Sequence, residues 1–226
     1  MESVETMEVA EKNCSKSSNG NSVKFEINVL NKAEGSAILS MGKNVVLTAL
    51  YGPYELKHLR VQDDLAFQVN YRTKAWSQGN NFKSIEDLIK SACESIFYPR
   101  PFSRHESTLL VQELQDDNSI LCCAVNASCL AIMATGMEMQ HLVTAGCCCI
   151  DEKGDMVLDP DGETIKKSKF VMTAAFECIN YNIVMINSEG SCSPKEFNAA
   201  TEMCKSGAKE MVKWFKAAIM KYSKVL

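Results

Sequence analysis

The chain has 226 residues, 46% of them hydrophobic and 23% charged, and its 28 acidic and 24 basic side chains give a formal net charge of −4. This length and composition predict one globular domain, of the kind found in soluble proteins, with a full hydrophobic core. An autonomous nucleic-acid binder usually has a basic balance, so any contacts of this acidic chain with RNA would be few, local or shared with other chains.

The eleven cysteines could suggest a disulfide framework, but their placement argues against it. Cys122-Cys123 and Cys147-Cys148-Cys149 are adjacent runs inside apolar stretches, and the chain has no C-x-x-C motif. Zinc sites normally use paired ligands at short spacing. We therefore expect reduced, mostly buried thiols in a cytosolic or nuclear protein, with no metal and no cofactor. The acidic first residues lack the apolar stretch of a secretory signal.

The chain begins with a polar tail, which we expect to be disordered over residues 1–22 and to precede a single domain at 23–226. Two apolar runs flank Gly42-Lys43 and predict a hairpin at residues 35–53. Alternating apolar residues predict a strand over 65–71, and helical spacing predicts a helix over about 81–97.

A strand over 107–114 leads into an uncharged helix over 119–135, for which Gly136 is the expected cap. The 18 uncharged residues Ile120 to Met137 reach the lower limit for a membrane span. Polar residues such as Asn126 interrupt them, so a buried core helix is favoured.

The second half of the chain predicts strands over 142–150 and 156–159 and a hairpin around Asn180. The sequence Ser193-Pro194-Lys195-Glu196 is typical of a helix start. One apolar stripe then continues to the end of the chain, through Phe197, Ala200, Cys204, Ala208, Met211, Phe215, Ile219 and Tyr222. The layout is α+β, with mixed sheets, a buried central helix and a long C-terminal helix.

Three stretches, at residues 35–53, 114–137 and 149–163, resemble the RNase PH family. They are similar to the family's opening hairpin, to its central strand, turn and buried helix, and to its acidic strand end. The resemblance runs from about residue 24 to 224 and implies an RNase PH-like fold (ribosomal protein S5 domain 2-like). Within the family, "LCCAVNASCLAIM", "VLDP" and "KYSK" resemble a core subunit of the eukaryotic RNA exosome.

The resemblance also implies a mechanism, because active members degrade RNA from its 3′ end with inorganic phosphate as the nucleophile. An arginine beside the turn before the central helix holds the phosphate. Here that turn reads Asp117-Asn118-Ser119-Ile120-Leu121, with Leu121 at the arginine position. The turn would need an arginine from elsewhere to bind an anion; alternatively, Asn118 or Ser119 caps the helix. We favour the cap, since Asp116 and Asp117 would repel phosphate by about as much as the helix dipole attracts it, on the order of 1 kcal/mol.

The acidic site of active members is also altered. Its first positions correspond to Asp159, Asp161 and Glu163, but the later position falls at Ser168 or Lys169. Lys83 replaces an arginine in the first helix. We therefore expect no catalytic residue, and we interpret seven positions as a degenerate active site: Asp117, Asn118, Ser119, Leu121, Asp159, Asp161 and Glu163.

Two short basic clusters and Lys83 are candidate RNA contacts, binding phosphates without sequence preference. The alternative is that they are ordinary exposed charges. The candidates are Lys57, Arg60, Arg72, Lys74 and Lys83.

The function implied by the resemblance is that of a non-catalytic ring subunit of the RNA exosome core, supporting 3′-to-5′ RNA processing by assembly and by lining the RNA channel. The implied partners are other RNase PH-type subunits in a six-membered ring, with ribosomal RNA-processing protein 43 in the same dimer, cap subunits, a separate nuclease and single-stranded RNA. The implied location is the nucleus and nucleolus, and also the cytoplasm. The alternative is a weak phosphate-dependent or hydrolytic exoribonuclease, as a free homodimer.

Overall fold

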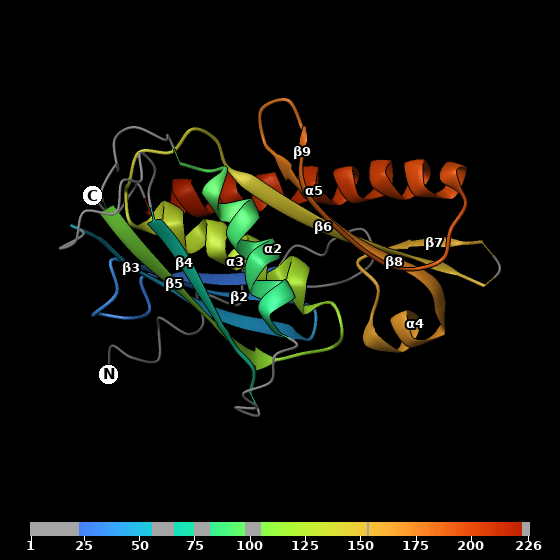
Figure 1. The fold of residues 1–226 in the computed structure, drawn as a ribbon, viewed down its shortest axis with the longest axis horizontal. Coiled ribbons are helices and arrows are strands. Elements are labelled where there is room, and N and C mark those ends of the chain that lie inside the picture. The colour runs from blue at the N-terminus through green and yellow to red at the C-terminus, as the bar shows by residue number, and fades with distance from the viewer. Residues whose placement is uncertain (1–22, 56–65, 75–81, 98–104, 153, 223–226) are drawn as a thin grey trace.

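Two β-sheets lie one after the other along the long axis of the molecule (Figure 1). The structure is a computed structural model, and it describes residues 23–55, 66–74, 82–97, 105–152 and 154–222. The expected α+β class with mixed sheets is confirmed. The predicted tail, together with Lys57 and Arg60, lies outside the described residues.

The first sheet has five strands in the order β1-β2-β3-β5-β4. Neighbouring strands are antiparallel except β4 and β5. A parallel pair needs a crossover connection, and helix α2 (Lys83–Glu94) lies between these two strands in the chain. The strands are β1 (Val23–Ile27), β2 (Gly35–Met41), β3 (Asn44–Glu55), β4 (Ala66–Arg72) and β5 (His105–Gln115).

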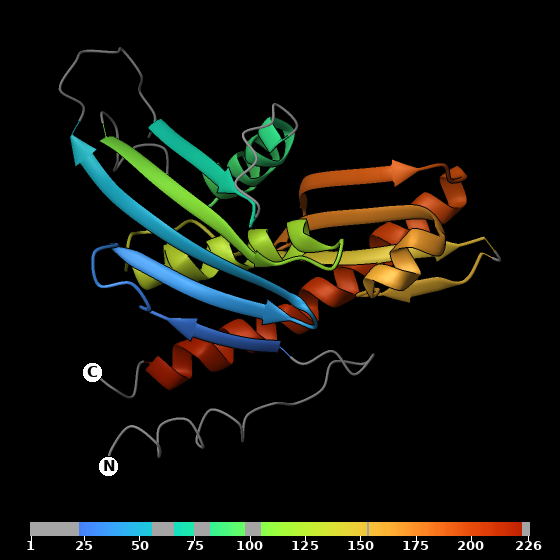
Figure 2. The same ribbon diagram turned by 90° about the horizontal axis from the view of Figure 1, so that it is seen from below.

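The second sheet has four antiparallel strands in the order β7-β6-β8-β9. Helix α5 (Pro194–Tyr222) packs on β6 and β8 and runs along the long axis of the molecule (Figure 2). Gly146 allows this close packing, because a Cβ there would collide with the backbone oxygen of Cys204 on α5. The strands are β6 (Val143–Asp151), β7 (Met156–Leu158), β8 (Ser168–Glu177) and β9 (Ile183–Gly190).

Helix α3 (Ile120–Ala134) lies between the two sheets, packing on β2 and β3 on one side and on β6 and β8 on the other. The Thr48 hydroxyl of β3 donates to the Ala127 carbonyl at 2.9 Å. The Asn126 amide donates to the Ala145 carbonyl of β6 at 3.0 Å and accepts the Ala145 N–H at 2.8 Å. The prediction of a buried core helix is therefore confirmed. Among the described helices, none is long and apolar enough to cross a membrane.

Several local predictions are also confirmed. Gly42 has a φ of 59° in the β2–β3 turn, and Gly136 has a φ of 71° just after α3. Ser193 and Glu196 form the predicted reciprocal cap of α5. The Ser193 N–H donates to the Glu196 carboxylate at 2.7 Å, and the Glu196 N–H donates to the Ser193 hydroxyl at 3.3 Å.

Three features differ from the sequence predictions. The sequence analysis predicts neither strand β1 nor the short helix α4 (Gly162–Lys167), which begins just after Asp161. Ile219 is 44% exposed, so the predicted apolar stripe of α5 does not stay buried to its end. Ala218, in the same turn, is fully buried, so the buried face of α5 continues there while Ile219 lies outside it.

The predicted burial of the cysteines is confirmed for most of those that the structure describes. Those residues are all free thiols, and all but Cys178 and Cys192 are buried. They pack as small apolar side chains in the core.

We predict that Asn126→Ala destabilises the fold by about 2–4 kcal/mol, because it leaves the buried N–H and carbonyl of Ala145 without partners. Urea unfolding measures the loss. Asn198→Ala, at an exposed position of α5, is the matched control and should change stability by less than about 0.5 kcal/mol. Equal effects of the two substitutions would contradict the role assigned to Asn126.

Candidate functional site

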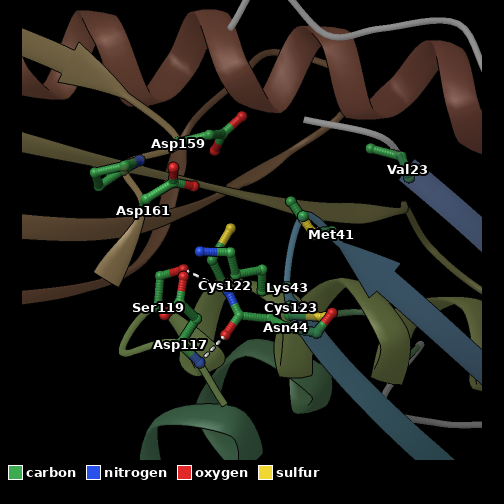
Figure 3. A pocket seen from close by; sticks show the side chains of 12 residues that line it. Val23, Met41, Lys43, Asn44, Asp117, Ser119, Cys122, Cys123, Asp159 and Asp161 are labelled. Carbon is green, nitrogen blue, oxygen red and sulfur yellow. Dashed lines mark hydrogen bonds between the residues drawn. The ribbon is translucent and has the colours of Figure 1, made fainter. Parts of the chain in front are cut away.

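A pocket lies where the β2–β3 turn, the turn before α3 and the segment between β7 and α4 meet (Figure 3). These segments are far apart in the sequence and belong to both sheets. The pocket is lined by Val23, Met41, Gly42, Lys43, Asn44, Asp117, Ser119, Cys122, Cys123, Asp159, Pro160 and Asp161. The structure thus brings together four of the seven predicted site positions, namely Asp117, Ser119, Asp159 and Asp161.

The buried side chain of Asn44 organises one wall of this pocket. Its amide donates to the Ser119 hydroxyl at 2.7 Å, and its carbonyl oxygen accepts the Asp117 N–H at 2.7 Å (Figure 3). Ser119 is at the N-cap position of α3 but makes no side-chain cap hydrogen bond. The prediction that Asn118 or Ser119 caps the helix is therefore confirmed for the position of Ser119 but not for a side-chain hydrogen bond, because the Ser119 hydroxyl instead accepts from Asn44 of β3. Asn118, with a φ of 64°, lies in the turn, where its N–H donates to the Asp116 carboxylate at 2.7 Å.

The carboxylate of Asp117 joins the turn before α3 to the start of α4. Its Oδ2 atom accepts the Gly162 N–H at 3.0 Å. A Cβ at position 162 would collide with Asp117 Oδ1, so a larger residue there would force the Asp117 side chain to move. The free N–H groups at a helix start favour negative charge, and here a carboxylate of the chain itself takes one of them. Leu121, at the position of the family's arginine, is buried in the core and provides no cation to the pocket.

Asp159 is a half-buried carboxyl group on the opposite wall. Its backbone has a φ of 49°, and its N–H donates to the Cys147 carbonyl at 2.9 Å. The pKa of Asp159 is raised to about 6, mainly by burial and also by the negative charge of Glu210 on α5. No local pattern in the sequence connects Glu210 with Asp159, because the two residues are 51 positions apart in the chain.

The pocket has an unfavourable charge for a phosphate ligand. Its lining includes three carboxyl groups, from Asp117, Asp159 and Asp161, but one cation, the exposed Lys43. An attacking phosphate needs cations and N–H donors to offset its repulsion from the RNA phosphate.

The pocket also lacks an activated nucleophile among its thiols. Burial raises the pKa of Cys123 to about 12 and that of Cys122 well above its usual range. Both thiols therefore stay protonated and unreactive at neutral pH. Among the described residues, no group of three or more His, Cys, Asp or Glu side chains is arranged to hold a metal ion.

The remaining predicted positions lie outside the pocket lining. Glu163 is exposed on α4, one residue after the glycine that binds Asp117. Arg72, Lys74 and Lys83 are exposed near the end of β4 and the start of α2. Their role in RNA binding stays a prediction. Asn44, which no local pattern marked, is the residue that holds the site together.

A family model described as "3′ exoribonuclease family, domain 1" (RNase PH) matches residues 20–138, which is more than half of the chain. The chain belongs to this family. It is 36% identical over 141 residues to a protein of Arabidopsis thaliana named "Exosome complex exonuclease RRP46 homolog"; the match covers 62% of this chain and 59% of that relative. It is 30% identical over 214 residues to "Exosome complex component Rrp41" of Pyrococcus abyssi, covering 90% of this chain and 86% of that protein.

The fold of this family member is also that of a solved relative. The crystal structure of rice Rrp46 superimposes with a TM-score of 0.82 at 22% sequence identity, covering 88% of this chain and 94% of the rice chain. The RNase PH-like fold and the likeness to an exosome core subunit, here Rrp46, are thereby confirmed, as the sequence motifs predicted for the fold and for such a subunit.

We predict that Asp159→Asn raises the stability of the protein above neutral pH. The unfolded chain loses this proton near pH 3.8 and the folded protein near pH 6. Between these values the folded state binds more protons, so the Asp159 contribution lowers stability as pH rises through this window. Asparagine carries no charge, so the substitution removes this loss of stability. Asparagine also tolerates a positive φ. The gain at about pH 7.5 should be on the order of 2 kcal/mol and should vanish near pH 4.

Urea unfolding of both proteins at the two pH values measures this effect. Asp161→Asn, an exposed carboxylate of the same pocket, controls for the loss of one negative charge. A gain for Asp159→Asn that is equal at both pH values would show that burial of the charged form is not its cause.

Proposed function

We propose that this chain is a ring subunit of an RNA exosome core that supports 3′-to-5′ RNA processing and degradation without catalysing phosphorolysis itself. One observation carries the proposal: the turn that holds phosphate in active family members here presents Asp117, whose carboxylate accepts the Gly162 N–H. A carboxylate thus lies in this turn, and the Asp117 and Asn118 N–H groups of the turn donate to the side chains of Asn44 and Asp116. Leu121 provides no cation in compensation.

The electrostatics of the pocket support this reading. Phosphate entering beside Asp117, Asp159 and Asp161 would meet carboxyl groups that Lys43 alone does not balance. Each uncompensated charge contact inside a partly desolvated pocket costs several times its value in water. The site therefore lacks the positive potential that the attack of one anion on another requires.

The assembly part of the proposal rests on the relatives, whose names describe exosome complex proteins. We propose other RNase PH-type subunits as ring partners, with ribosomal RNA-processing protein 43 in the same dimer, together with cap subunits and a separate nuclease. Single-stranded RNA would pass through the ring near Arg72, Lys74 and Lys83, which are exposed at one end of the first sheet. Such an assembly would work in the nucleus, the nucleolus and the cytoplasm.

We predict that the purified chain releases no nucleoside diphosphates from 3′-tailed single-stranded RNA, with or without inorganic phosphate. The reason is that Leu121 stands where active family members have the arginine that holds the phosphate. The measurement is chromatography of the reaction products beside an active family member as positive control. Phosphate-dependent release that Asp159→Asn abolishes would contradict the proposal.

A second candidate function is weak exoribonuclease activity by a free homodimer. Membership of a 3′ exoribonuclease family favours it, and Asp159, with a pKa near 6, could exchange a proton near neutral pH. In that case Asp159→Asn should abolish activity, whereas Glu163→Gln, outside the pocket, should not.

We predict that the tagged full chain co-purifies from its own cells with other RNase PH-type subunits in equal amounts. Native mass measurement of the purified material distinguishes a ring from a dimer of this chain. A homodimer with no RNase PH-type partner, in cells where the ring subunits are present, would favour the second candidate.

A further inference from the structure

A row of lysines follows one flank of α5, away from the pocket. Lys205, Lys209, Lys213 and Lys216 are spaced by four, four and three residues. At 3.6 residues per turn they fall within about 80° of the helix circumference, and the row is about 16 Å long. The last three are exposed and Lys205 is half-buried. We call these four residues the α5 lysine row.

The α5 lysine row has no carboxylate partner among the described residues. The ion pairs of the described residues join Lys90 to Glu94 and Lys169 to Glu196, and neither pair includes a lysine of the row. Glu202 is the one acidic residue of α5 on the same flank, upstream of the row. Glu210, beside Asp159, lies about 100° further round the helix than Lys209.

Lysines three or four residues apart on a helix repel one another by about 0.2–0.5 kcal/mol per pair. The row thus contains repulsion that an external polyanion would relieve. The row has four lysines in a chain whose overall charge is −4, and the nearest acidic residues of α5 are Glu202, three residues before Lys205, and Glu210, three residues before Lys213.

An aromatic ring lies against this row. The Lys209 ammonium is 5.2 Å from the centre of the Tyr181 ring. Tyr181 belongs to the connection between β8 and β9, with a φ of 58°, and is partly exposed. Cations that follow a backbone, together with an aromatic side chain beside them, form the combination by which proteins bind single-stranded nucleic acid without sequence preference.

From these contacts we infer that the α5 lysine row and Tyr181 bind the phosphate backbone of single-stranded RNA, at a surface separate from the acidic pocket. Lysine is a point charge without the fork geometry of arginine, so it suits phosphates in any sequence. The lysines form a single file along one helix flank, which matches one nucleic-acid strand. The inference rests on the proposed RNA-related function and adds an RNA surface outside the pocket.

The test is fluorescence anisotropy with a labelled oligouridylate and the full chain. The double variant Lys209→Glu/Lys213→Glu should weaken binding about tenfold at low salt and reduce the slope of log affinity against log salt by about 1.4. The matched control is Lys24→Glu/Lys32→Glu, which makes the same charge change at exposed positions on and next to β1. Tyr181→Leu should weaken binding severalfold and leave the salt slope unchanged.

Equal loss in both double variants would overturn the inference, since the effect would then come from net charge alone. No RNA binding by the wild-type chain, or wild-type binding by Lys209→Glu/Lys213→Glu, would overturn it too. If the row bound an acidic protein instead of RNA, Lys209→Glu/Lys213→Glu would bind RNA as well as the wild-type chain does. The proposed function is judged separately, by co-purification with ring subunits, which these variants should leave unchanged if the row contacts RNA.

Discussion

The structure depends on the burial of an uncharged helix between two sheets. Helix α3 has its side chains buried from Leu121 to Ile132, and such a helix is stable only if the few polar groups around it find partners. Thr48 and Asn126 meet this requirement, one toward each sheet. Gly35 lets β2 approach α3 so closely that a Cβ would collide with the Ala131 carbonyl. Packing and polar contacts together fix the helix in one position between the sheets.

The fixed position of α3 places its N-terminal turn against the hairpin and the acidic segment. Asn44 bonds to Ser119 and Asp117, and Asp117 bonds to Gly162. The pocket keeps the arrangement of an anion site, yet its donors and charges are used within the chain. The polar groups of the pocket therefore stabilise the fold.

Helix α5 separates two electrostatic environments. Glu210 on one flank adds negative charge beside the half-buried Asp159, whereas Lys209 on another flank stacks on Tyr181. A single helix therefore contributes to the acidic character of the pocket and presents cations elsewhere. This division explains how an acidic chain can offer a local surface to a polyanion while its pocket repels one.

The sequence by itself determined the elements whose signals are local. The hairpin at Gly42-Lys43, the buried helix after Ser119 and the cap at Ser193 and Glu196 follow from turn chemistry and periodicity, which depend on neighbouring residues. Only the tertiary structure decided which polar groups meet. Ser119 had the sequence of a cap, but Asn44, 75 residues away, takes its hydroxyl. Asp117 likewise binds Gly162, and Glu210 acts on Asp159, across distances in the chain that no local pattern encodes. Hydrogen bonds and charges act through space, so the site is set by how the sheets pack around α3.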